Sequence, residues 1–378
     1  MLYREFGKTG EKVSILGFGC MRFPTLNGDV KQIDEIKATE MIRYAIDNGV
    51  NYIDTAYPYH GGMSEPFVAK ALKDGYREKV YLATKLPSWL IKTREDMDKY
   101  LNEQLERLET EYIDFYLLHT LDKSSWDNLM KNEVLEFLEK AKKNGKIKHI
   151  GFSFHDKLEV FKEIVDAYDW EFCQIQLNFL DEDYQAGLEG LKYATDKNIG
   201  MVIMEPLRGG KLANNIPDDI MNIWDRNSVK RTPVEWALRY IWNHPEVNVV
   251  LSGMSEMDHV VENLRIANEA EANSLKPEEK NLIDEVKEMY LSRIKVNCTD
   301  CKYCMPCPAG VNIPRCFSLF NDGYMFNQIE NYRNSYNKFV KDENKASMCV
   351  ECGKCEEVCP QHIKIRDMLH EVVEIFEK

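Results

Sequence analysis

The chain has 378 residues, of which 44% are hydrophobic, so it can bury a substantial core and is too long for one ordinary small domain. Its formal net charge of −14 argues against a nucleic-acid partner, because proteins that bind phosphate backbones normally carry a basic surface. The chain contains no run of about 18 apolar residues, and its first residues are charged. We therefore expect neither a membrane span nor a signal peptide, and we predict a cytoplasmic protein.

Short β-rich runs alternate with amphipathic helical stretches from residue 13 to about residue 270. Before them, the opening residues predict a small hairpin that turns at Thr9-Gly10 and closes the lower end of a barrel. The predicted strands are, in chain order, 13–19, 51–56, 79–85, 113–120, 147–154, 173–179, 200–206 and 247–253. Eight such units are the number that closes a (β/α)8 TIM barrel, although the same alternation also fits a doubly wound open sheet.

The composition changes after a helical stretch at 277–293, where the chain becomes rich in Cys, Pro and Asn. Of the 11 cysteines, only Cys20 and Cys173 precede residue 298. In a reducing compartment such a cluster indicates metal binding before disulfides. We therefore predict two domains, a barrel over residues 1–292 and a small cysteine-rich domain over residues 293–378.

Four polar residues fall where barrel strands are expected to end, which is where TIM barrels carry their active sites. Asp54 ends the second strand, Lys85 the third and His119 the fourth, and Tyr59 lies in the loop after Asp54. Taken alone, each of these residues has an ordinary structural explanation. Charged residues that are buried at consecutive strand ends, however, must be paired, because a lone buried charge is costly. A Lys ammonium favours the phenolate of a nearby Tyr, and a His can orient a carbonyl oxygen. Together they predict a proton donor for an alkoxide formed by hydride transfer.

Several sequence motifs resemble those of the aldo-keto reductase family over roughly residues 1–275. YIDTAYPYHGGMSE resembles its Asp-and-Tyr signature, LATKLP its Lys motif and DFYLLHTLD its His motif, and GKIKHIGFS, QIQLN and VVLSGMSEMDHVVENL match later strands. The resemblance implies an oxidoreductase that reduces an aldehyde or ketone with NAD(P)H. It also implies that Asp54, Tyr59, Lys85 and His119 form the catalytic tetrad, with Tyr59 as general acid. Tyr57 is a rival acid that the spacing disfavours.

The same resemblance implies a set of residues that contact the nicotinamide cofactor. They are Cys20, Met21, Ser153, Gln174, Met204, Pro206, Leu207, Gly209, Gly253, Met254, Ser255, His259, Glu262 and Asn263. The Lys and Arg with which many relatives grip a 2′-phosphate are replaced here by Gly253 and His259, with Arg208 or Lys211 as possible substitutes. NADP(H) is the expectation from the family, and NAD(H) remains open.

Two cysteine runs, each followed by Pro, dominate the C-terminal part. The runs are Cys298, Cys301, Cys304 and Cys307, and Cys349, Cys352, Cys355 and Cys359. The second has the bacterial ferredoxin spacing for a [4Fe–4S] cluster, and the first is one residue shorter in its last gap. Two zinc sites of four cysteines each are the alternative, which the close spacing disfavours.

In two-cluster ferredoxins the last Cys of each run binds the other cluster. By that pattern one cluster would use Cys298, Cys301, Cys304 and Cys359, and the other Cys349, Cys352, Cys355 and Cys307. The segment 317–339 between the runs indicates helices, which predicts a mainly α-helical ferredoxin-like domain. YCMPCPAGVNIP and CVECGKCEEVCPQHI resemble the ferredoxin-type tail of an aldo-keto reductase subfamily.

Two functions remain open on the sequence. The first is a carbonyl reductase acting on a small-molecule substrate, with two [4Fe–4S] clusters of structural or regulatory role. The second is an electron-transfer protein whose clusters serve a ferredoxin- or flavodoxin-type redox partner, with the barrel as a binding scaffold. The complete tetrad favours the first, and the eight spaced cysteines keep the second open.

Overall fold

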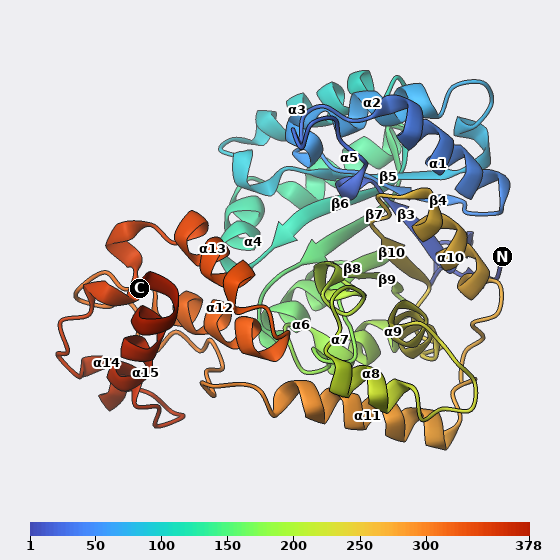
Figure 1. Ribbon diagram of the computed structural model, residues 1–378. Coiled ribbons are helices and arrows are strands. Elements are labelled where there is room, and N and C mark those ends of the chain that lie inside the picture. The colour runs from blue at the N-terminus through green and yellow to red at the C-terminus, as the bar shows by residue number, and fades with distance from the viewer. The chain divides into compact units, whose positions relative to one another are not determined.

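The computed structural model describes residues 1–378, and eight of its strands form a closed parallel barrel (Figure 1). The barrel strands are β3 (Leu16–Gly19), β4 (Tyr52–Asp54), β5 (Tyr81–Leu86), β6 (Ile113–Leu121), β7 (Ile147–Phe154), β8 (Phe172–Gln176), β9 (Gly200–Met204) and β10 (Val249–Ser252). They pair in chain order, and β10 closes the ring by pairing with β3. The predicted (β/α)8 barrel is therefore confirmed, and the open sheet is excluded.

Helices surround the barrel and cover its outer side (Figure 1). They are α1 (Glu35–Asp47), α2 (Ser64–Ala71), α3 (Arg94–Arg107), α4 (Lys123–Lys131), α5 (Val134–Lys143), α6 (Leu158–Ala167), α7 (Gly187–Thr195), α9 (Pro233–Trp242) and α10 (Met257–Ala267). Because the strands lie between the barrel interior and these helices, most of their residues are buried, as in β6, where only Thr120 is partly exposed. The strands therefore form near-continuous apolar runs with polar residues at their ends.

An N-terminal hairpin closes the lower end of the barrel, as the sequence predicts. Its strands β1 (Tyr3–Glu5) and β2 (Lys12–Ser14) pair antiparallel. Phe6, in the connecting loop, is fully buried and contacts the rings of Tyr52, Phe115 and Phe172. Tyr52 and Phe172 are the first residues of their strands, so the plug lies at the amino ends, opposite the predicted active site.

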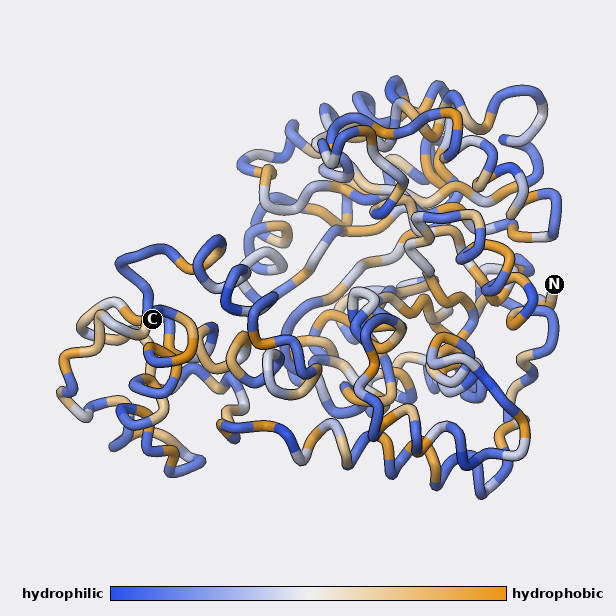
Figure 2. The backbone as a smooth tube through the Cα atoms, in the orientation of Figure 1, coloured by the Kyte–Doolittle hydropathy of each residue, from blue (hydrophilic) through white to orange (hydrophobic).

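The chain divides into two compact units, residues 1–212 with 232–276, and residues 213–231 with 277–378. The regular structure of the second unit is helical, as predicted for the cysteine-rich part. Its α-helices are α8 (Asp218–Trp224), α11 (Pro277–Leu291), α12 (Ile313–Met325), α13 (Ile329–Phe339), α14 (Lys354–Glu357) and α15 (Ile365–Val372). Hydrophobic and hydrophilic residues alternate along α11 (Figure 2). The predicted domain boundary between residues 292 and 293 follows α11 and stays a prediction.

Hydrogen bonds around Tyr336 hold the C-terminal segment in the second unit. The Tyr336 hydroxyl donates to Glu377 Oε1 at 2.6 Å and accepts from the Ala346 amide at 2.7 Å. Cys316, the cysteine left over from the two runs, is buried 3.8 Å from that hydroxyl. Burial raises the pKa of the Cys316 thiol to about 12, so this thiol stays protonated and packs as an apolar group.

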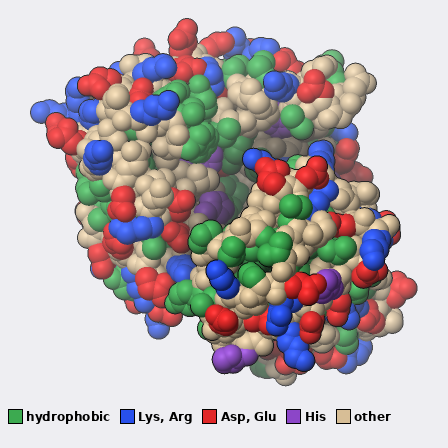
Figure 3. Space-filling model, turned by 90° about the vertical axis from the view of Figure 1, so that its left-hand side faces the viewer, with side chains coloured by type: hydrophobic (Ala, Val, Ile, Leu, Met, Phe, Trp, Pro, Cys, Tyr) green, Lys and Arg blue, Asp and Glu red, His purple; other side chains and the backbone are tan.

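No helix has both the length and the apolar composition needed to cross a lipid bilayer. On the face in Figure 3, acidic and basic side chains are interspersed, and no continuous basic patch occurs on it.

Candidate functional site

The structure brings the four predicted catalytic side chains to the carboxyl ends of neighbouring strands. Asp54 is the last residue of β4, Lys85 the penultimate residue of β5, and His119 lies near the end of β6. Tyr59 begins a short 3₁₀ turn (Tyr59–Gly62) in the loop after β4. Because parallel strands end at one rim of the barrel, residues far apart in sequence meet there.

Lys85 and Asp54 form a buried ion pair at the bottom of this site. The Lys85 ammonium donates to both Asp54 carboxylate oxygens at 2.7 Å and to the Thr55 carbonyl at 2.8 Å. Lys85 is 0% exposed and Asp54 is 2% exposed. Burial lowers the pKa of Lys85, but the Asp54 charge, the nearby Tyr59 and the hydrogen bonds to Asp54 together outweigh burial, so the pKa lies above the ordinary value. The pair therefore places a permanent positive charge below the Tyr59 ring.

Tyr59 lies between this cation and His119. Its ring centroid is 5.2 Å from Lys85 Nζ and 6.1 Å from the His119 ring, edge to face. Burial raises the pKa of Tyr59, while the Lys85 charge lowers it. The expected effect of Lys85 is therefore present, but burial outweighs it and Tyr59 is a phenol at neutral pH.

His119 is a neutral imidazole in this environment. Burial lowers its pKa well below the usual value, and the charge of Lys85 lowers it further. Its Nδ1 atom is buried and has no hydrogen-bond partner, and the Trp89 ring lies 5.2 Å from the imidazole. Trp89 is 51% exposed, so an aromatic surface borders the site.

Tyr57, the rival acid, is held away from the ion pair. Its hydroxyl donates to Glu103 at 3.2 Å, and the Arg107 guanidinium lies 4.2 Å from its ring centroid. No contact joins it to Lys85, whereas Tyr59 is placed directly above that residue. Phe23, another aromatic near the strand ends, is 3% exposed and packs in the core against Phe67.

A buried polar network behind Lys85 was missed by the sequence analysis. The Gln104 amide nitrogen donates to the Lys85 carbonyl at 3.0 Å and to Glu65 at 2.8 Å. Glu65 also accepts from the Thr84 hydroxyl at 2.7 Å, and the Tyr116 hydroxyl donates to Gln104 at 2.9 Å. Gln104 occupies the buried face of α3, and a polar residue in that apolar stripe is the signal that would have revealed it.

Ser153 and Gln174, two of the predicted nicotinamide contacts, are adjacent register partners on β7 and β8. Ser153 accepts a 2.7 Å hydrogen bond from the Thr120 amide, and Gln174 donates weakly to Met204 Sδ at 3.2 Å. The Gln174 Oε1 atom is buried without a partner. A buried acceptor of this kind fits a hydrogen-bond donor from a bound ligand.

The remaining predicted cofactor residues occupy loops at the same rim and the helix that follows β10. The turn after β3 contains Cys20 and Met21, and the loop after β9 contains Pro206, Leu207 and Gly209. The loop between β10 and α10 contains Gly253, Met254 and Ser255. Helix α10 itself carries His259, Glu262 and Asn263. A Cβ atom at Gly209 would lie 3.4 Å from the Arg22 guanidinium, and one at Gly253 3.0 Å from its Cδ atom. The three loops therefore meet around Arg22, a cation that the sequence analysis missed.

Two of the residues on α10 have partners within the protein. The Asn263 amide donates to the Ser252 hydroxyl at 2.9 Å, and Glu262 accepts from the Thr232 hydroxyl at 2.6 Å. His259 is exposed, and its Nδ1 accepts from the Ser255 amide at 3.4 Å. Asn263 therefore ties α10 to the end of β10, and Glu262 is already engaged in a hydrogen bond.

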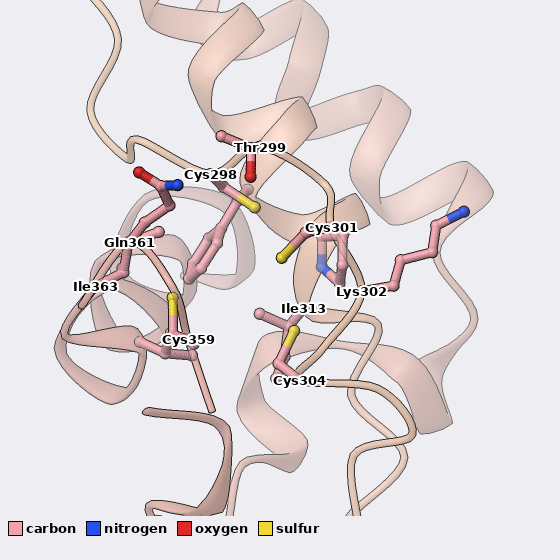
Figure 4. A pocket seen from close by; sticks show the side chains of 12 residues that line it. Cys298, Thr299, Cys301, Lys302, Cys304, Ile313, Cys359, Gln361 and Ile363 are labelled. Carbon is pink, nitrogen blue, oxygen red and sulfur yellow. The ribbon is translucent and has the colours of Figure 1, made fainter. Parts of the chain in front are cut away.

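The second unit contains a hollow that four cysteines share. Cys298, Cys301 and Cys304 of the first run line it together with Cys359 from the end of the second run. Figure 4 shows their sulfur atoms pointing into a common space. This space is partly open to solvent.

A second hollow is lined by the other four cysteines of the two runs. They are Cys307, Cys349, Cys352 and Cys355. Each hollow thus combines three cysteines of one run with the last cysteine of the other, the exchange that two-cluster ferredoxins show. No group of Cys, His, Asp and Glu side chains converges closely enough to hold a single metal ion.

The sequence matches two known families, one for each part of the chain. Residues 15–288 match the aldo/keto reductase family, and residues 297–363 match the 4Fe-4S dicluster domain. L-galactose dehydrogenase of Arabidopsis thaliana is 28% identical over 309 residues, which cover 75% of this chain and 94% of that protein. A probable aldo-keto reductase 1 of Glycine max is 28% identical over 294 residues, covering 69% of this chain and 82% of that protein.

A solved structure has the same fold as the barrel part. The holo form of an aldo-keto reductase from Bacillus halodurans superposes with a TM-score of 0.63 at 29% identity. The match covers 76% of this chain and 96% of that one.

Proposed function

Because the chain belongs to the aldo/keto reductase family, an oxidoreductase family, we propose that it reduces an aldehyde or ketone to the alcohol with a nicotinamide cofactor. We propose further that its C-terminal part carries two [4Fe–4S] clusters. The observation that carries the first proposal is the buried Lys85–Asp54 pair below Tyr59, beside a neutral His119. This arrangement provides both a proton and a group that can orient a carbonyl oxygen.

The nicotinamide, when bound, supplies the hydride for the carbonyl carbon. Tyr59 donates its hydroxyl proton to the carbonyl oxygen, which gives the neutral alcohol and leaves a phenolate. The Lys85 charge stabilises that phenolate, and Asp54 holds the ammonium in place through two 2.7 Å hydrogen bonds. The neutral His119 ring donates a hydrogen bond that orients the substrate oxygen.

Substitution of Tyr59 tests this proposal, and Tyr57 offers a matched control two residues away. We expect Tyr59→Phe to lower kcat/KM for aldehyde reduction by about 10²- to 10⁴-fold, the usual contribution of a general acid. Tyr57→Phe should stay within a few-fold of the wild type, because Tyr57 contacts Glu103 and not Lys85. Iron content should be equal in both variants. Retained turnover in Tyr59→Phe, or an equal loss in Tyr57→Phe, would refute the assignment.

The cofactor that we propose is NADP(H), with NAD(H) as the alternative. The buried, unpartnered Gln174 Oε1 supports nicotinamide binding, and Arg22 offers a positive charge to phosphate groups where three loops meet. Gly253 and the exposed His259 offer little charge for a 2′-phosphate. Binding constants for NADPH and NADH, measured by quenching of protein fluorescence, decide between the two cofactors, since a 2′-phosphate site requires tighter binding of NADPH.

The clusters that we propose would each be held by one of the two mixed cysteine sets. Analysis of iron, acid-labile sulfide and zinc in anaerobically purified protein tests this proposal. We expect iron and sulfide in equal amounts and no stoichiometric zinc. Zinc without sulfide would establish the alternative of two tetrahedral sites.

We also propose that the clusters exchange single electrons with a ferredoxin- or flavodoxin-type partner. Hydride transfer moves two electrons, whereas each cluster moves one, so the barrel chemistry and the clusters are not directly matched. An anaerobic titration with NADPH, followed by visible absorption and EPR, tests their connection. Bleaching of the iron–sulfur absorption would show electronic coupling to the barrel, and unchanged absorption with reduction by a low-potential ferredoxin would show that the clusters work with the partner.

A further inference from the structure

The hollow lined by Cys307, Cys349, Cys352 and Cys355 also has an arginine in its wall, Arg366 near the start of α15. Its Nε atom is shielded from solvent and has no hydrogen-bond partner, although 43% of the side chain is exposed. The guanidinium is anchored at its other end, where NH2 donates to Glu356 Oε2 at 2.9 Å. A buried donor without an acceptor is costly, and it indicates an acceptor that the hollow receives.

One contact places this guanidinium against the cysteine loop. A Cβ atom at Gly353 would lie 3.8 Å from Arg366 Cζ, so the backbone between Cys352 and Cys355 runs beside the guanidinium. Arg366 and the four cysteines therefore line the same hollow, and the Nε atom of Arg366 has no partner within the protein.

The other hollow has no comparable cation. Besides its four cysteines it is lined mainly by apolar side chains, among them Ile313, Phe317 and Ile363. Its one charged lining residue, Lys302, is exposed, and Figure 4 shows its side chain pointing away from the sulfur atoms. The side chain of Arg366 is also partly exposed, but its Nε atom is shielded from water.

We propose that Arg366 donates from Nε to a sulfur atom of the cluster in its hollow and makes that cluster the easier of the two to reduce. One-electron reduction adds one negative charge to a cluster. A cation and a hydrogen bond to sulfur stabilise the reduced form more than the oxidised form, and this raises the reduction potential. Electrons that enter the domain would therefore reside first at the cluster beside Arg366. The inference rests on the proposed binding of two [4Fe–4S] clusters.

The test is an EPR-monitored redox titration of the full chain with dithionite, under anaerobic conditions. It compares the wild type with Arg366→Gln and with Lys302→Gln, which removes the same charge at the other hollow. We expect Arg366→Gln to lower one of the two potentials. At a fixed ambient potential, the ratio of reduced to oxidised cluster should fall at least tenfold. For a one-electron couple this corresponds to a fall of the reduction potential by about 59 mV. Lys302→Gln should leave both potentials unchanged.

Iron and sulfide content, measured first, separates the two proposals. If the wild type lacks the iron and sulfide of two clusters, the proposed function fails before any potential is compared. With both clusters present, unchanged potentials in Arg366→Gln, equal shifts of both clusters, or an equal shift in Lys302→Gln would overturn the role of Arg366. If Arg366→Gln does not load both clusters, Arg366→Lys replaces it. Arg366→Lys keeps the positive charge but lacks the shielded Nε donor, so we expect the same reduction potential to fall by a smaller amount. An unchanged potential in Arg366→Lys would overturn the proposal.

Discussion

Replacement of Asp54 by Asn should destabilise the barrel strongly, because it leaves a buried ammonium without its counter-ion. Lys85 is 0% exposed, and two of its three hydrogen bonds go to the Asp54 carboxylate. Removal of one partner of such a buried pair costs about 3–5 kcal/mol of unfolding free energy. Without Asp54, burial lowers the pKa of Lys85 in the folded variant below its pKa in the unfolded chain. Between these two pKa values the unfolded chain binds more protons than the folded one, so the free energy of unfolding of the variant should rise with pH.

The double variant Asp54→Asn with Lys85→Met separates stability from catalysis. It removes both charges, so most of the lost stability should return, while carbonyl reduction stays abolished because Tyr59 lacks its cation. Urea unfolding followed by tryptophan fluorescence measures this, since all six tryptophans lie before residue 243 and five of them lie in the barrel unit. A loss below about 1 kcal/mol in Asp54→Asn, or a double variant as unstable as the sum of the single variants, would refute the ion-pair argument.

Three further outcomes are expected. The kcat/KM for carbonyl reduction should stay constant through neutral pH and fall only above the raised pKa of Tyr59, because only the phenol form donates a proton. Because His119 is already neutral, the pH profile should show no inflection near the usual histidine pKa of about 6.5. Phe6→Ala should lower the urea stability of the barrel by about 3–5 kcal/mol with unchanged iron content, because Phe6 fills the lower end of the barrel and contacts no cysteine hollow. Cys352→Ala should remove about half of the bound iron, whereas the same change at the packed Cys316 should remove none, as iron analysis would show.

The barrel was predictable because its information is local. Strand-forming runs alternate with amphipathic helices eight times, and each predicted strand overlaps one strand of the closed barrel. The hairpin and its plug followed from a turn at Thr9-Gly10. The helical character predicted for the aromatic segment between the cysteine runs is also present, as two helices, α12 and α13, separated by residues 326–328.

Electrostatic balance and side-chain orientation needed the tertiary structure. The sequence indicated that Lys85 lowers the pKa of Tyr59, but only the packing around the ring shows that burial outweighs this charge. The choice between Tyr57 and Tyr59 depended on motif spacing in the sequence, whereas in the structure Glu103 and Arg107 hold Tyr57 elsewhere. Burial depends on the whole set of neighbours, and these come from distant parts of the chain.

The sequence by itself determined the fold class, the four strand-end residues and the eight spaced cysteines, because periodicity, motif order and ligand spacing are properties of short segments. Only the tertiary structure decided which side chains share a site without sharing a motif. Gln104 reaches the Lys85 carbonyl from a helix, and Arg366 lies in a cysteine hollow from a segment beyond both cysteine runs. Such contacts arise where the chain folds back on itself, and no local pattern of the sequence records them.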